Sequence, residues 1–96
     1  MRPSLALQSH RSAVREIALR HRVRNVRVFG SVLRGEDAEG SDLDLLVDPT
    51  ADTTLMDLAA IEMEVERLLG VAVDVLTPNA LPESFRAAVL AGAEPV

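Results

Sequence analysis

The chain lacks cysteine, tryptophan, tyrosine and lysine, and only two of its 96 residues are phenylalanine. Without cysteine it can form neither a disulfide framework nor a thiolate metal site, which makes the reducing cytoplasm the expected compartment. No apolar run approaches the roughly 18 residues that a membrane-spanning helix needs, and no secretory signal follows the first residues. We therefore expect a cytoplasmic protein that does not bind a membrane.

The remaining composition is that of a small globular domain with an uneven distribution of charge. Hydrophobic residues make up 48% of the chain, enough for residues 1–96 to form one domain with a modest core. The net charge is −5, yet the arginines gather in residues 1–34 and the acidic residues in residues 35–96. A basic leading segment suits nucleic acid, a solvated helix face or an acidic protein partner. Nucleic acid is disfavoured because no tryptophan or tyrosine is present for base stacking, and pairing with a second copy stays open.

Hydrophobic periodicity predicts helices alternating with strands, in the order αβ(α)βαβα. This order predicts an α+β fold in which helices pack on one small mixed sheet. The run over residues 71–76 is nearly continuous in apolar character, which places it at the centre of that sheet. The predicted helices cover residues 5–20, 32–34, 54–69 and 83–90, and the predicted strands cover residues 26–29, 42–47 and 71–76.

Small and polar residues mark the ends of these elements. Gly30 ends the first strand, because glycine takes backbone angles that are closed to other residues. Ser31 is predicted to cap the short helix that follows. Thr53 or Thr54 caps the long helix and Gly70 closes it.

Three aspartates on two predicted strands are the strongest chemical signal. Side chains alternate along a strand, so Asp42 and Asp44 lie on one face while Leu43 and Leu45 point into the opposite layer. Asp74 joins them if the third strand neighbours the second. Two unit charges about 6 Å apart repel by about 3 kcal/mol at an effective dielectric constant near 20. A divalent cation that prefers oxygen ligands, Mg²⁺ or Mn²⁺, would relieve this repulsion.

Gly30 and Ser31 form a turn of small residues that leaves room for a phosphate group. Ten residues separate this turn from Asp42, and phosphate and metal chemistry are expected together. A Gly-Lys-Ser/Thr phosphate loop and a Gly-x-Gly-x-x-Gly dinucleotide motif are both absent.

Each of these features also has a purely structural interpretation. Taken alone, Gly30 and Ser31 are better explained as an ordinary strand-to-helix turn. The Asp42 and Asp44 pair could be solvated at the entry of a strand, and Asp74 could be a buried acid paired with an arginine such as Arg27. The conjunction of all three features favours the chemical interpretation.

The residues in this order resemble a known family. Residues 29–35 read Phe-Gly-Ser-Val-Leu-Arg-Gly and residues 41–47 read Ser-Asp-Leu-Asp-Leu-Leu-Val, which is similar to the signature of the DNA polymerase β-like nucleotidyltransferase superfamily. Within it the chain resembles the minimal nucleotidyltransferases, the antitoxin-type partners of HEPN-domain proteins. The resemblance covers nearly the whole chain and implies a nucleotidyltransferase core.

The resemblance implies roles for the matching positions. Gly30 and Ser31 would receive the triphosphate of ATP. Asp42 and Asp44 would bind two Mg²⁺ ions, with Mn²⁺ as an alternative. Asp74 would complete the metal site and favour deprotonation of the attacking hydroxyl.

Two further positions in the signature carry implied roles, and two depart from the family pattern. Arg34 would contact phosphate, or else form a salt bridge across the loop of residues 35–41. Ser41 would orient the carboxylates and belong to the nucleotide site. Val32 stands where relatives often have a polar or basic residue, and Leu33 replaces a small one.

The implied activity is the transfer of AMP from ATP to a hydroxyl, expected on a tyrosine, of a HEPN-type toxin that is neutralised by the modification. The acceptor must come from another molecule, because the chain has no tyrosine and is too short to carry an acceptor domain. One alternative is an antitoxin that neutralises its partner by binding alone. Another is a nucleotidyltransferase for a small molecule or an RNA end, with a separate acceptor subunit.

Overall fold

The computed structural model describes residues 1–96 and contains one mixed four-stranded sheet in the order β3-β2-β1-β4. Strand β2 runs antiparallel to β1 and parallel to β3, and β4 runs antiparallel to β1. The strands are β1 (Val23–Phe29), β2 (Leu43–Pro49), β3 (Val73–Leu76) and β4 (Glu94–Pro95). The predicted α+β fold with a small mixed sheet is confirmed.

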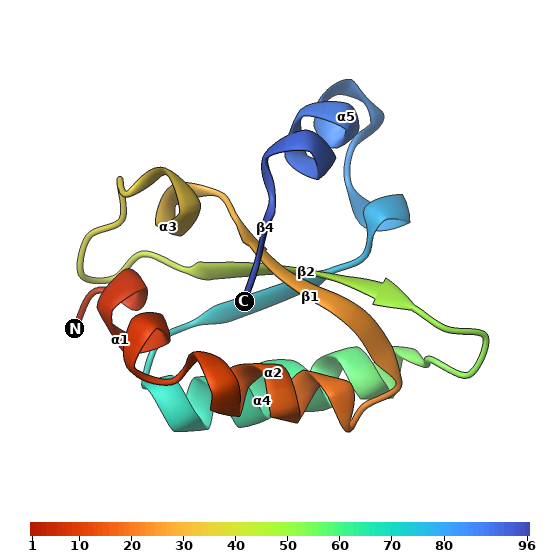
Figure 1. The fold of residues 1–96 in the computed structure, drawn as a ribbon, viewed down its shortest axis with the longest axis horizontal. Coiled ribbons are helices and arrows are strands. Elements are labelled where there is room, and N and C mark those ends of the chain that lie inside the picture. Colours follow the sequence, from red (N-terminus) through yellow and green to blue (C-terminus); the bar gives the residue numbers. More distant parts are fainter.

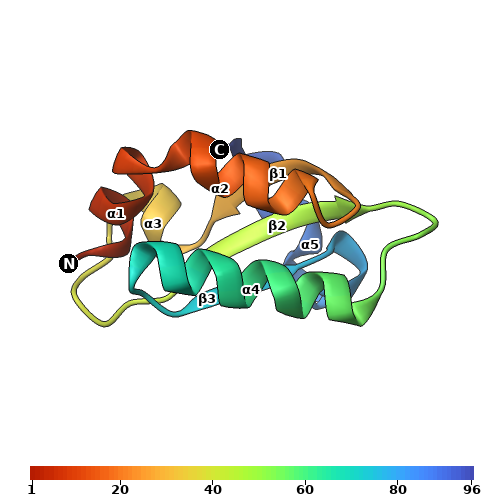
Figure 2. The same cartoon turned by 90° about the horizontal axis from the view of Figure 1, so that it is seen from below.

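Helices α1, α2 and α4 cover one face of the sheet, while α3 and α5 lie on its other side (Figure 1). Seen from the helix-covered side, α2 and α4 lie next to one another across the strands (Figure 2). None of the helices combines the length and apolar character needed to cross a bilayer. The helices are α1 (Pro3–Ser9), α2 (Arg11–Leu19), α3 (Ser31–Arg34), α4 (Leu55–Leu69) and α5 (Glu83–Gly92), with a 3-10 turn η1 (Pro78–Ala80).

The hydrophobic core lies between the sheet and the layer of α1, α2 and α4. Alternate residues of β2, Leu43, Leu45 and Val47, are fully buried there, as the predicted alternation requires. Helix α4 contributes Ile61 and Val65, which are also fully buried. This side of the sheet therefore provides most of the packing that stabilises the fold.

Helix α4 begins and ends where the sequence predicts. Thr54 and Asp57 form a reciprocal capping box at its start, in which the Thr54 hydroxyl accepts from the Asp57 N–H at 3.2 Å. Gly70 closes the helix in the left-handed conformation at φ 71°. Both predicted boundaries are confirmed.

The predicted helix over residues 5–20 is wrong as a single element. It is two helices, α1 and α2, separated at His10, whose φ of −135° and ψ of 24° interrupt the helical path. Periodicity could not detect the break, because apolar residues on both sides of it are buried in the same core. The break directs the start of α1 toward the loop of residues 35–41, where Asp37 accepts the N–H of Ser4 at 2.9 Å.

Strand β3 lies at the edge of the sheet, so the predicted central position is wrong. Val73 and Val75 are buried, whereas the side chain between them is exposed. The N–H groups of these two valines donate to the side chains of Glu66 and Glu62, at 3.0 and 2.9 Å. Helix α4 therefore covers both the apolar face and the outward N–H groups of this edge strand.

The last part of the chain crosses the sheet from one edge to the other. Strands β3 and β4 are the two edge strands, and η1 and α5 connect them over the face opposite α2 and α4 (Figure 1). The predicted last helix is confirmed and extends to Gly92, whereas η1 and β4 were not predicted. Helix α5 has no buried residue, and its base is held by Arg86, which donates to the carbonyls of Pro78 and Leu81 at 2.8 and 2.9 Å.

Candidate functional site

The structure brings the three predicted aspartates together on the face of the sheet that α2 and α4 leave open. In the parallel pairing of β2 with β3, Asp44 lies directly beside Asp74. Asp42 lies immediately before β2, two residues from Asp44 and therefore on the same side. Leu43, between Asp42 and Asp44, and Val73, directly before Asp74, are buried in the core on the opposite side.

Negative charge accumulates at this point. Partial burial raises the pKa of the Asp44 carboxyl above its ordinary value, the charges of Asp74 and Asp42 raise it further, and Arg34 opposes them. Asp42 and Asp74 are exposed to solvent on either side of Asp44. The arrangement therefore favours a cation, which would lower the energy of all three ionised carboxylates.

Gly30 lies in direct contact with the central carboxylate. A Cβ atom placed on Gly30 would lie 2.3 Å from Oδ2 of Asp44, too close for any side chain. The same residue has φ 77° and ψ −152°, a conformation that glycine alone adopts readily. Strand β1 brings it there, because Phe29 pairs with Asp44 in the antiparallel register. The turn and the carboxylate are thus parts of one site.

Ser31 is the first residue of α3 rather than its cap. Gly30 occupies the N-cap position and no side chain caps the helix, so the predicted capping role of Ser31 is wrong. The carbonyl of Ser31 accepts the N–H of Glu36 at 2.9 Å. Ser31 therefore lies next to the Gly30 and Asp44 contact, and its backbone also anchors the start of the following loop.

Arg34 and Ser41 both contribute to the loop of residues 35–41. The Arg34 Nε lies 3.3 Å from Oε1 of Glu36, which is the salt bridge considered as the structural alternative. Arg34 also lies close enough to Asp44 to stabilise its charge. The Ser41 hydroxyl accepts the N–H of Ala38 at 2.9 Å and so closes a turn in the loop, one residue before Asp42.

The proposed pairing of Asp74 with Arg27 is wrong. Arg27 donates instead to Asp48 on the adjacent strand β2. Asp74 is exposed at the sheet edge, so it is not the buried acid that its apolar neighbours suggested. The sequence could not show this, because buried and exposed residues alternate along an edge strand as they do along a half-covered central one.

The residues present fit a divalent metal, although they do not form a closed cage. The donors are carboxylate oxygens, the ligands that Mg²⁺ and Mn²⁺ prefer. No three carboxylate or imidazole side chains of the protein already surround one point at which an ion would be held. Because Asp42 and Asp74 are exposed, their side chains can turn toward an ion without disturbing the core.

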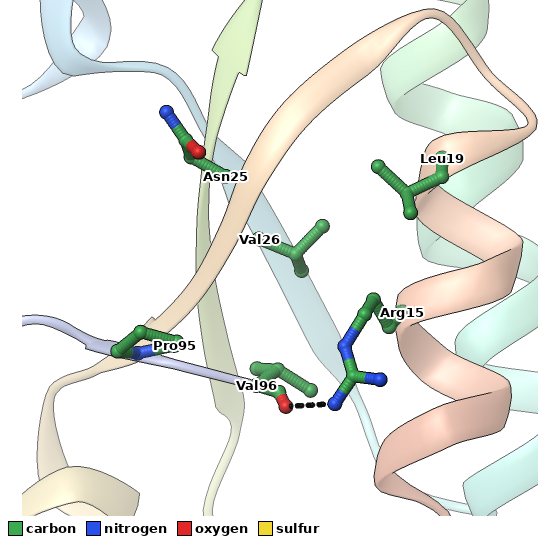
Figure 3. A pocket seen from close by; sticks show the side chains of 6 residues that line it. All are labelled: Arg15, Leu19, Asn25, Val26, Pro95 and Val96. Atoms are coloured by element: carbon green, nitrogen blue, oxygen red, sulfur yellow. Dashed lines mark hydrogen bonds between the residues drawn. The ribbon is translucent and has the colours of Figure 1, made fainter.

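The protein has two surface pockets, and neither lies over the three aspartates. One, of about 280 Å³, lies between α2 and the β1 and β4 edge, where Arg15 donates to the Val96 carbonyl at 2.7 Å (Figure 3). The other, of about 380 Å³, lies beside the loop and includes Ser41 and Gly70. Neither contains an aspartate, so the three carboxylates lie on an open face that a second molecule can approach.

Asp37 is a residue to which the sequence assigned no role. It is the one charged residue among the buried side chains of the protein. Its position in the polar loop gave no signal, because an acidic residue in a loop is ordinarily solvated. Only the position of α1 against the loop shows that Asp37 is enclosed.

Comparison with known proteins agrees with the geometry. The family model described as "Nucleotidyltransferase domain" matches residues 7–92. The protein adenylyltransferase MntA of Thermococcus cleftensis is 38% identical over 84 residues, which are 88% of this chain and 82% of that protein.

Two solved structures have the same fold. A protein classed as a minimal nucleotidyltransferase is 44% identical, with a TM-score of 0.86 over 97% of this chain and 95% of its own. A chain of a toxin-antitoxin crystal structure with AMP-PNP has a TM-score of 0.70 over 83% of this chain and 66% of its own; at 15% identity, this similarity concerns the fold alone. The chain therefore belongs to the nucleotidyltransferase domain family, in its minimal form, and is an enzyme that transfers nucleotidyl groups.

Proposed function

We propose that this protein transfers AMP from ATP to a hydroxyl group of a partner protein, and that the partner is a HEPN-type toxin which the modification neutralises. The observation that carries the proposal is the placement of Asp42, Asp44 and Asp74 around the Gly30 turn on an open face of the sheet. The name of the Thermococcus cleftensis relative supports a protein acceptor. The toxin-antitoxin neighbour supports the proposed biological role.

In this proposal Asp42, Asp44 and Asp74 hold divalent metal, with two Mg²⁺ ions expected and Mn²⁺ as the alternative. The bound metal would offset phosphate charge and lower the pKa of the attacking hydroxyl. Asp74, at the exposed edge of the site, takes the proton from the acceptor hydroxyl. The acceptor oxygen forms a bond to the α-phosphorus of ATP, the bond from that phosphorus to the β-phosphate oxygen breaks, and pyrophosphate leaves.

The proposed nucleotide contacts lie on the other side of Asp44. Gly30 lets the backbone approach the triphosphate closely, and Ser31 adds a hydroxyl beside it. Arg34 adds positive charge near Asp44. Ser41 acts through the loop turn that it closes with Ala38. AMP-PNP in the toxin-antitoxin neighbour supports ATP as the nucleotide. A location in the cytoplasm, expected from the absence of cysteine, is part of the same proposal.

The acceptor hydroxyl is proposed to be a tyrosine of the partner. The chain has no tyrosine, so it cannot itself supply that acceptor. The test is to incubate the purified protein with Mg²⁺, ATP and the product of the adjacent gene. We expect an AMP-sized mass increase on a partner tyrosine, absent with Asp44→Asn, and an unmodified active partner would contradict the proposal.

A binding antitoxin without catalysis is the second candidate, and helix α5 favours it. This helix has no buried residue, and its Phe85 and Leu90 are exposed apolar side chains that suit a protein partner. The double variant Asp42→Asn with Asp44→Asn separates the two candidates. Neutralisation of the partner that survives this change supports binding alone, whereas its loss supports catalysis.

A further inference from the structure

The loop of residues 35–41 joins the two halves of the site. It begins after α3, which starts at Ser31 directly after Gly30, and it ends just before Asp42. Its first part is tied to α3 through the hydrogen bond from the Glu36 N–H to the Ser31 carbonyl. Its last part is a turn in which Ala38 and Ser41 exchange two hydrogen bonds, of 2.9 and 3.0 Å. The middle of the loop has no regular secondary structure to hold it.

Asp37 occupies that middle position and is held by α1. Its Oδ2 accepts the N–H of Ser4 at 2.9 Å, and its Oδ1 accepts from Arg2 Nη2 at 3.4 Å. Arg2 Nε also donates to the backbone carbonyl of Asp37 at 3.1 Å. Three hydrogen bonds thus connect this single residue to a segment 33 to 35 positions earlier in the chain.

The contact of Asp37 with Arg2 and Ser4 is both buried and charged. The Asp37 side chain is completely inaccessible to solvent, which by itself raises the pKa of the carboxyl. The hydrogen bonds from Ser4 and Arg2 and the charge of Arg2 outweigh this effect, so the pKa of Asp37 is lowered. The carboxylate therefore remains ionised at neutral pH and keeps both partners.

Helix α1, which makes this contact, is itself packed into the hydrophobic core. Ala6 and Leu7 of α1 belong to the hydrophobic core and are almost completely buried. No side chain of α1 or of the residue before it caps the helix, so Asp37 provides the capping acceptor from a distant part of the sequence. The loop is consequently fixed to the core through α1, although none of its other residues is buried.

We propose that Asp37 is a positioning residue, which fixes the loop of residues 35–41 to α1 and so holds Asp42 at the distance from the Gly30 turn that metal and nucleotide binding require. The inference rests on the proposed function, because it assigns Asp42 to the metal site. Residues that hydrogen-bond a metal ligand directly typically change metal affinity or activity by about 10- to 100-fold when they are replaced. Asp37 acts on Asp42 through the loop, so we expect an effect at the lower end of this range.

The test compares Asp37→Ala with Val65→Ala, a core variant in α4 on the helix-covered side of the sheet. Both lose stability, so binding is measured well below both melting temperatures, with Mn²⁺ and a non-hydrolysable ATP analogue. We expect affinity for the metal–nucleotide pair to fall about tenfold in Asp37→Ala and to stay unchanged in Val65→Ala. Amide hydrogen exchange at Ser41, whose N–H donates to the Ala38 carbonyl at 3.0 Å, should accelerate only in Asp37→Ala.

Equal affinity of Asp37→Ala and the unchanged protein, or equal losses in both variants, would overturn the inference. Asp37→Asn is the second variant should Asp37→Ala not fold, because its amide oxygen still accepts the Ser4 N–H; we expect a smaller loss in the same direction. If the unchanged protein binds no metal–nucleotide pair, the proposed function fails instead. The hydrogen exchange of Ser41 then still decides whether Asp37 holds the loop.

Discussion

The two faces of the sheet serve different purposes, although the same strands form both. Toward α2 and α4, β2 presents Leu43, Leu45 and Val47, all fully buried. Toward α3 and α5 it presents Leu46, which is also fully buried, and Asp44, whose ionised form is disfavoured by partial burial and by its acidic neighbours. One face thus stabilises the fold while the other concentrates charge at a cost in stability.

The comparison shows that stability and chemistry are separated by the alternation of side chains along one strand. Consecutive residues of β2 point to opposite faces of the sheet. Substitutions on the two faces should therefore have opposite signatures. Those at Leu43, Leu45 and Val47 should change the free energy of unfolding, and those at Asp44 should change binding and activity. Leu46 shares the face of Asp44 but is fully buried, so its replacement should also change the free energy of unfolding.

The largest effect is expected from Leu45→Ala, on the buried face. Removing this fully buried side chain leaves a cavity and should lower the free energy of unfolding by about 2 to 5 kcal/mol. Urea denaturation measures the change, with Leu55→Ala, at an exposed position, as the control. A loss from Leu45→Ala no larger than that of the control would contradict the division between the faces.

Asp44→Asn should have the opposite effect: it should reduce activity without reducing stability. We expect AMP transfer to fall by about 100-fold or more, equivalent to about 3 kcal/mol, because the central metal-binding carboxylate is neutralised. The melting temperature should stay the same or rise, because a destabilising charge is removed. Asp48→Asn is the matched control: Asp48 accepts from Asn25 at 2.7 Å and from Arg27, outside the carboxylate cluster. If Asp44→Asn lost stability but kept AMP transfer, Asp44 would stabilise the fold rather than bind the metal.

Gly30→Ala tests the contact between the turn and the carboxylate. We expect a loss of about 1 to 3 kcal/mol in stability from the positive φ, together with weaker Mn²⁺ binding because the new Cβ displaces Asp44. Gly35→Ala is a close control, since Gly35 has φ 70° but nothing within 4 Å of its Cβ position. Equal Mn²⁺ affinities in the two variants would show that the close contact has no role in metal binding.

The smallest effect concerns acid stability, measured by urea denaturation without metal between about pH 3 and pH 6. The lowered pKa of Asp37 stabilises the fold above 3.8, the ordinary value, and this contribution is lost as the pH falls through the folded-state pKa. The raised pKa of Asp44 has the reverse sign, because its stabilising contribution is present below 3.8 and is lost as the pH rises.

Asp37→Asn should therefore flatten the decline in stability at acid pH, and Asp44→Asn should steepen it. Parallel profiles for the two variants would mean that these carboxyls do not have opposite effects on the fold.

The parts of the fold that could be predicted depend on local signals. Helix α4 has its own capping residues and its own apolar stripe, so its boundaries follow from nearby sequence. Asp42 and Asp44 share a face for the equally local reason that strand residues alternate. The edge position of β3, the pairing of β4 with β1 and the break at His10 depend on distant neighbours, and the sequence did not predict them.

By itself, the sequence determined the family, the helix and strand order in outline, and the identity of the three carboxylates. These properties follow from residue types, their periodicity and their spacing along the chain. Tertiary structure alone decided that Asp74 is exposed beside Asp44, that Gly30 touches that carboxylate, and that α1 encloses Asp37. Burial and charge coupling arise only when distant segments pack together, and no local pattern encodes them.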